Sequence, residues 1–143
     1  GAYFFLWNQS KEATLYSEYF ERDPGLITPM SSTNEYEFYH AMTDYKSGNY
    51  SIAIKTWDSL SKLNPASDTL HYFLASAYLA NENTDKAIEH FEKVIALSSF
   101  FEADAYWYLG LAQLKKRNKQ EAFTYIEKSD HPEKKMLLEK LKE

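Results

Sequence analysis

The sequence predicts an all-α protein built from repeated helix pairs, with one helix before the repeats and one after them. The 143 residues contain only 4 Gly and 4 Pro, too few turn residues for many short strands. Apolar residues recur at helical rather than alternating spacing. Similar segments also return along the chain: Ala53, Ala87 and Ala122 are 34 and 35 residues apart. A period of that length is typical of a helical repeat array.

Composition excludes several classes of protein. Aromatic residues make up 17% of the chain, which is incompatible with intrinsic disorder. The absence of Cys excludes disulfides, thiolate metal sites and thiol nucleophiles. A net charge of −5 argues against nonspecific nucleic-acid binding, so we expect no nucleic-acid partner.

Residues 1–33 form an N-terminal extension in this interpretation. A helix is expected near residues 10–22, because its apolar residues have helical spacing. Pro24, Gly25 and Pro29 then favour an extended stretch over residues 23–33. The residues that carry the helix pattern are Ala13, Leu15, Tyr16, Tyr19 and Phe20.

The repeat domain is expected over residues 34–143, with repeats at about 34–67, 68–102 and 103–129. Each repeat contains two helices, and we expect these to start near 34, 50, 68, 84, 103 and 119. The pattern is clearest in the fourth helix, where Ala87, Phe91 and Val94 recur on one face with charged residues between them.

Sequence signals for helix starts follow in the last quarter of the chain. Asn118 to Glu121 and Asp130 to Glu133 each have the pattern of a capping box. Pro132 would then occupy the first position of a helix over residues 132–142. The apolar face of that helix suits a cap on the exposed end of a repeat array.

At the repeated positions the chain resembles the tetratricopeptide repeat (TPR) family. Leu74-Ala75 and Leu109-Gly110 match the leucine and small residue of the family pattern, and Asn64-Pro65 matches its terminal proline. The resemblance implies a short right-handed solenoid of helix pairs, an alpha-alpha superhelix. It also implies a noncatalytic module that binds a protein or peptide in a concave groove.

The resemblance further implies which residues contact the partner, because the first helix of each repeat lines the groove in this family. The implied surface is largely aromatic, and such side chains suit binding hot spots. The candidate partner-binding residues are Phe38, Tyr39, Met42, Tyr45, Tyr72, Phe73, Ser76, Leu79, Trp107, Tyr108, Leu111 and Lys115.

Some TPR domains grip the C-terminal carboxylate of a chaperone with a clamp of Lys, Asn and Arg. The matching positions here carry other residue types, so we expect no such co-chaperone role. These positions are Phe38, Met42, Phe73, Asp104 and Tyr108.

Four alternatives stay open at this stage. Most of the candidate aromatics could be core residues rather than binding residues. The protein's own N-terminal segment, either residues 3–7 or the helix with Tyr16, Tyr19 and Phe20, could occupy the groove, since large exposed apolar patches are unusual. That segment could also dock into a second copy and form a homo-oligomer, or the chain could be an accessory domain of a larger enzyme.

Catalysis and cofactors have little support. His40, His71, His90 and His131 lack metal-ligand spacing, and the sequence contains no phosphate-binding loop or GxSxG motif. We therefore expect no enzyme activity, metal or cofactor. The basic run from Lys115 to Lys119 leaves a contact with a polyanion or membrane surface as a minor alternative.

Membrane insertion by this segment is not expected, because the longest apolar run, Ala2 to Trp7, is far too short to span a bilayer. The phrase from Leu15 to Pro29 looks like the linker that precedes the repeats in certain anchored bacterial TPR proteins. On that basis we expect a periplasmic domain whose upstream anchor was removed, with a cytoplasmic location as the alternative.

Overall fold

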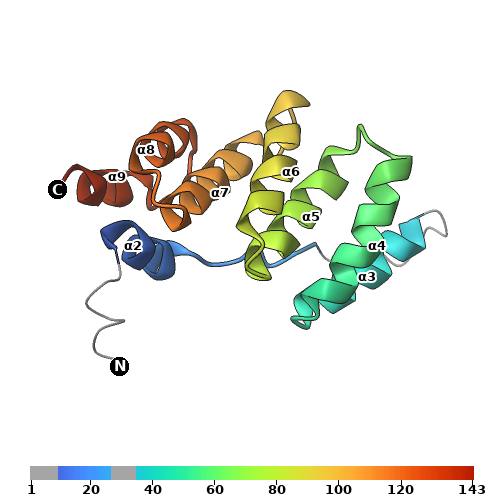
Figure 1. The fold of residues 1–143 in the computed structure, drawn as a ribbon. Coiled ribbons are helices and arrows are strands. Elements are labelled where there is room, and N and C mark those ends of the chain that lie inside the picture. Colours follow the sequence, from blue (N-terminus) through green and yellow to red (C-terminus); the bar gives the residue numbers. More distant parts are fainter. Residues whose placement is uncertain (1–9, 27–34) are drawn as a thin grey trace, which may run out of the picture. The chain divides into compact units, whose positions relative to one another are not determined.

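The computed structural model describes residues 10–26 and 35–143, and its described regular structure is entirely helical. Two compact units are distinguished: one contains α2 and α7–α9, and the other runs from Arg22 to Phe101 and contains α3–α6 (Figure 1). The helices are α2 (Lys11–Tyr19), α3 (Tyr36–Lys46), α4 (Tyr50–Leu63), α5 (Asp68–Ala80), α6 (Thr84–Ala96), α7 (Glu102–Lys115), α8 (Lys119–Lys128) and α9 (Lys134–Lys142).

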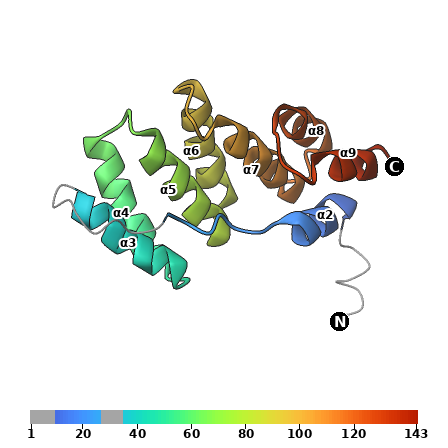
Figure 2. The same cartoon turned by 180° about the vertical axis from the view of Figure 1, so that it is seen from behind.

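In the unit that starts at Arg22, each helix packs against the next one in the chain, so that α3–α4 and α5–α6 form two consecutive pairs (Figure 2). Apolar residues at helical spacing face the neighbouring helices. Ala53 and Trp57 of α4 and Phe91 of α6 are fully buried. The Trp57 indole N–H also donates to the backbone oxygen of Phe38, at 3.2 Å.

In the other unit, α7 packs closely on α8. Gly110 is buried at this crossing, and a Cβ atom built on it would collide with the side chain of Ile126. Gly110, which matches the small residue of the family pattern, therefore lies where these two helices cross closely. Helix α2 packs against α7 in the same unit, and α9 packs against α8.

The turn inside each repeat has the same backbone conformation. Gly48, Glu82 and Arg117 all have positive φ, at 83°, 65° and 65°. These residues are 34 and 35 apart, the period of the sequence repeat. Left-handed backbone costs a non-glycine residue about 1 kcal/mol, so this recurrence shows that the repeat dictates the turn.

The N-terminal helix is shorter than expected. Ser10 caps it, with its hydroxyl accepting from the N–H of Ala13 at 3.0 Å. It ends at Tyr19 rather than near residue 22, and Phe20 has an extended backbone (ψ 124°). The boundary predicted between an N-terminal extension and the repeat domain, at residues 33 and 34, lies outside the described residues.

The two capping boxes are wrong in detail. The Asn118 side chain donates to the Gln113 side chain at 2.8 Å instead of capping α8. Helix α9 begins at Lys134, so Pro132 is not its first residue. Instead, the His131 Nδ1 atom accepts from the N–H of Glu133 at 3.0 Å, and this contact holds residues 131–133 in a turn.

None of the described helices is long and apolar enough to cross a bilayer. This finding concerns residues 10–26 and 35–143 alone.

Candidate functional site

The twelve candidate partner-binding residues are mostly buried inside the protein. Eight have at most 4% of their surface exposed: Met42, Tyr45, Tyr72, Phe73, Ser76, Leu79, Trp107 and Leu111. Four are half-buried: Phe38, Tyr39, Tyr108 and Lys115. The first-helix face is therefore largely covered by other parts of the chain.

Part of this burial is ordinary core packing. The Phe73 ring is 6.2 Å from the ring of Trp57, 6.4 Å from Tyr45 and 5.8 Å from Phe101, measured between centroids. Contacts of this kind contribute to stability through buried area and ring geometry. Phe73 is thus a core residue of its unit and is not accessible to a partner.

A second part of the burial comes from the segment that follows α2. The Tyr45 hydroxyl of α3 donates to the backbone oxygen of Asp23 at 2.6 Å. The Tyr72 hydroxyl of α5 donates to the Asp23 carboxylate at 2.8 Å. Asp23 is thereby held by the first helices of two successive repeats. We give the name tyrosine site to Tyr45, Tyr72 and Tyr50, whose ring centroid lies 5.7 Å from that of Tyr45.

The residues on either side of Asp23 also fit this surface. The Arg22 guanidinium lies 5.1 Å from the ring centroid of Tyr45 and 6.0 Å from that of Tyr50. A cation at this distance is attracted to the ring faces. The Arg22 guanidinium also donates to the backbone oxygen of Lys46 at 3.3 Å.

Gly25 completes the contact. Its N–H donates to the Asp23 carboxylate at 2.8 Å, which closes a tight local turn. Its φ of 93° favours glycine, and a Cβ atom there would lie 2.9 Å from the sulfur of Met42. The segment therefore approaches α3 so closely at this position that only glycine fits.

Burial, followed by the nearby negative charge of Asp23, raises the pKa of the Tyr45 hydroxyl above its usual value of 10. The hydroxyl is consequently protonated, and able to donate, across the physiological pH range.

In the other unit, α2 covers the first helix of the third repeat, α7. Leu15, Tyr16 and Tyr19 are the buried residues of α2. The Lys115 ammonium lies 5.1 Å from the ring centroid of Tyr16. The backbone oxygen of Glu21, just past the helix, accepts from the Tyr108 hydroxyl at 3.0 Å.

A residue of α9 also contacts α2. Lys140 donates to the Glu18 carboxylate at 2.8 Å and lies 5.1 Å from the ring centroid of Tyr19. The hydrogen bond to Glu18 raises the pKa of Lys140. Because both charged groups are well exposed, this pair contributes little to stability.

An open cleft of about 590 Å³ lies between α3, α4 and α5. Two of the half-buried candidates, Phe38 and Tyr39, line it together with Leu60 and Leu70. Glu37 adds a carboxylate to the lining. Two of the four partly accessible candidates therefore lie in this cleft.

A buried histidine pair lies elsewhere in the same unit. The Nδ1 atoms of His71 and His90 are 3.0 Å apart, and the Nε2 atom of His71 is 2.7 Å from the backbone oxygen of Pro65. A carbonyl only accepts, so His71 Nε2 carries a proton. With both rings neutral, His90 Nδ1 then donates to His71 Nδ1.

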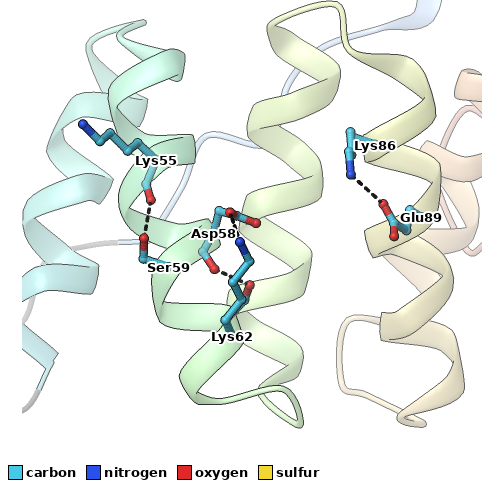
Figure 3. A network of polar contacts seen from close by, with 7 residues as sticks. Lys55, Asp58, Ser59, Lys62, Lys86 and Glu89 are labelled. Carbon is cyan, nitrogen blue, oxygen red and sulfur yellow. Dashed lines mark hydrogen bonds and ion pairs between the residues drawn. The ribbon is translucent and has the colours of Figure 1, made fainter.

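The charged residues near this pair come from two helices. Asp58 pairs with Lys62 on α4 at 3.2 Å, and Lys86 pairs with Glu89 on α6 at 3.5 Å (Figure 3). These residues and both histidines line one cavity of about 320 Å³. Burial, with a smaller effect from the charge of Lys93, lowers the pKa of His90 to about 4.

Sequence reasoning missed both polar features. His71 and His90 belong to different helices, and nothing in their spacing signals a contact. The role of Asp23 was also missed, although the neighbouring Pro24 and Gly25 were recognised as residues that do not continue a helix. Within the described part of the chain, no group of three His, Asp or Glu side chains is arranged to hold a metal ion.

Two family models match this chain. Residues 40–100 match one described as tetratricopeptide repeat, and residues 104–133 match another with the same description. No protein of curated function matches.

Solved structures are similar in fold. The first TPR of Spaghetti (RPAP3), bound to the HSP90 peptide SRMEEVD, is 21% identical, with a TM-score of 0.68 over 75% of this chain and 88% of that chain. The type III secretion chaperone SycD of Yersinia enterocolitica, in complex with a peptide of the translocator YopD, is 22% identical. Its TM-score is 0.70, over 80% of this chain and 97% of that chain. The predicted fold class, an all-α solenoid of helix pairs, is confirmed.

Proposed function

Because the chain belongs to the tetratricopeptide repeat family, we propose that it is a noncatalytic module that binds a peptide or partner protein through the first-helix face. We propose further that its own N-terminal segment occupies this face and competes with the partner. The similar structures bound to an HSP90 peptide and to a YopD peptide support the first part.

The observation that carries the proposal is the pair of hydrogen bonds from Tyr45 and Tyr72 to Asp23. Both tyrosines are on the first helices of repeats, where the family pattern implies partner contacts. Both donate to a segment outside the repeats. A surface that holds one non-helical segment by its backbone and side chain is suited to hold another.

The packing of α2 supports the same proposal in the other unit. Helix α2 buries Leu15, Tyr16 and Tyr19 and packs on α7, and an amphipathic helix that packs on a partner surface is a common mode of peptide recognition by helical proteins. Tyr108 and Lys115, two of the candidate binding residues, contact this segment.

The test is a full-length double variant, Leu15→Ala with Tyr19→Ala, compared with the unchanged chain against a displayed library of random peptides. We expect the variant to retain its helical circular dichroism, bind more of an apolar dye and select peptides that the unchanged chain binds weakly. If a folded variant selects no peptide, the binding function is wrong. If both chains select peptides equally well, only the competition by the N-terminal segment is wrong.

A structural self-association module stays the second candidate, because the segment that docks within one chain could dock on a second copy. Light scattering over a wide concentration range separates the two. We expect a monomer; a mass that rises to a dimer would favour self-association. The periplasmic location also stays a prediction.

A further inference from the structure

The chemistry of the tyrosine site specifies more than a generic peptide. Its two hydrogen-bonding groups, the hydroxyls of Tyr45 and Tyr72, both donate to Asp23, one to the backbone and one to the carboxylate. A hydroxyl that donates to a carboxylate forms a stronger bond than one that donates to a neutral group. The position occupied by Asp23 therefore selects an acidic residue.

The position before it selects a cation. The ring faces of Tyr45 and Tyr50 flank the Arg22 guanidinium, and the backbone oxygen of Lys46 accepts from it. A planar guanidinium satisfies ring faces and a carbonyl oxygen together better than an ammonium does.

The position two residues after the acid selects glycine. Any larger residue at Gly25 would meet the sulfur of Met42 and the side chain of Lys46, and would have to adopt a φ of 93°. Pro24, between them, is exposed, so the site places little demand on that position.

From these contacts we infer that the tyrosine site recognises a turn of sequence Arg-Asp-x-Gly on a partner protein, and that Arg22–Gly25 is an internal copy of that turn. The inference rests on the proposed function and names the chemistry of its ligand. The partner gains access when its own turn displaces the internal copy.

The probe is a fluorescent peptide with the sequence of residues 20–26, acetylated and amidated at its ends. Its target is the full chain carrying Asp23→Asn, which keeps the volume of the side chain but weakens the internal competitor. We expect this variant to bind the peptide about tenfold more tightly than the unchanged chain. The reason is that its own segment no longer offers a charged carboxylate to the Tyr72 hydroxyl and therefore competes less well.

Substituted peptides test the sequence requirement. Replacing the aspartate of the peptide by asparagine is expected to weaken binding about tenfold, and so is replacing its glycine by alanine. Replacing the arginine by alanine is expected to cost a few-fold. A scrambled peptide of the same composition is the control.

A double-mutant cycle ties the requirement to one side chain. With Tyr72→Phe added to the target, the aspartate and asparagine peptides are expected to bind with similar affinity. If they still differ tenfold, Tyr72 does not recognise the carboxylate and the inference is overturned.

The inference and the proposed function fail in different ways. If the opened chain selects library peptides without the Arg-Asp-x-Gly pattern, and the substituted peptides bind as well as the original, the inference is wrong while the binding function stands. If neither these peptides nor a library binds, both are wrong. If the unchanged chain forms a dimer and its Asp23→Asn variant does not, the tyrosine site binds a second copy of this chain. The inference that it recognises a turn on a partner protein is then wrong.

Should Asp23→Asn unfold the chain, Arg22→Ala is the alternative target, with the same expected ranking of peptides.

Discussion

The N-terminal segment is held in two different ways in the two units of the molecule. In the unit with α3–α6, Asp23 lies in a tight turn outside any helix and accepts from the hydroxyls of Tyr45 and Tyr72. In the unit with α7–α9, the segment is helical and is held by buried apolar side chains such as Leu15. The first contact depends on direction and charge, and the second depends on area.

This difference separates the strength with which the N-terminal segment docks from the sequence specificity of its docking. Apolar burial is roughly proportional to the area removed from water and has no direction, so many amphipathic helices could replace α2. A hydrogen bond weakens steeply when its angle or distance changes, so few sequences could replace Arg22–Gly25. We therefore expect α2 to supply most of the docking free energy of the N-terminal segment and, in the proposed function, the tyrosine site to supply most of the sequence selection.

The largest expected effect is in the apolar contact. Leu15→Ala is expected to lower the free energy of unfolding by about 2–3 kcal/mol, since it removes a buried leucine at the contact with α7. Urea unfolding followed by circular dichroism measures it. Lys11→Ala, at an exposed position of the same helix, is the control. A loss below about 0.5 kcal/mol for Leu15→Ala would contradict the importance of α2.

The next effect tests the core on which α2 rests. Gly110→Ala is expected to cost about 1–3 kcal/mol, because the new methyl group collides with Ile126 at the crossing of α7 and α8. The matched change is Ala75→Gly at the corresponding position of α5, expected to cost about 1 kcal/mol through helix propensity. Equal stability of Gly110→Ala and the unchanged chain in thermal unfolding would refute the close crossing.

A smaller effect is expected at the polar contact. Tyr72→Phe removes the donor to the Asp23 carboxylate and is expected to cost about 1–2 kcal/mol in urea unfolding. Tyr39→Phe on α3 is the control, since the Tyr39 ring packs on Phe38 rather than on Asp23. A loss as large as that of Leu15→Ala would break the division between strength and specificity.

The pH dependence is the smallest effect at neutral pH and grows on acidification. His90 has a pKa of about 4 in the folded chain and an ordinary value of 6.5. The unfolded chain therefore binds more protons between these values, and stability is expected to fall as the pH falls from about 6.5 toward 4.

His90→Gln is the variant that tests this pH dependence, with His40→Gln at an exposed position as its control. Urea midpoints are measured at several pH values. On acidification the midpoint is expected to fall less in His90→Gln than in the unchanged chain, and to fall as much in His40→Gln as in the unchanged chain. An unchanged acid sensitivity of the His90 variant would exclude His90 as its source.

Local sequence signals predicted the helices well because each signal acts within a few residues. The starts of α4, α5, α6 and α8 were predicted at their observed residues, and the small residue at Gly110 was recognised from its repeat position. The predicted start of α9 was wrong because the turn before this helix depends on a contact with a ring that is distant in the sequence. His131 stacks on Trp107, at 3.8 Å between centroids, and that ring position fixes the turn before the helix.

At the level of the sequence, burial of most of the candidate partner-binding residues was only one alternative, because burial depends on contacts between distant parts of the chain. The family pattern identifies which helix faces the groove, but it does not say what covers that face. Asp23 contacts Tyr72 across 49 residues of sequence, and His71 contacts His90 from another helix. Whether such residues meet depends on how helices pack.

By itself the sequence determined the all-α class, the period of the repeat and the family, because periodic apolar spacing and turn residues act locally and recur three times. Only the tertiary structure decided that most of the aromatic face is covered, and by which residues. Burial of a side chain depends on every segment that packs against it, including the segment before the repeats. The position of Asp23 between Tyr45 and Tyr72 is a result of that packing and has no signature in the spacing of these residues.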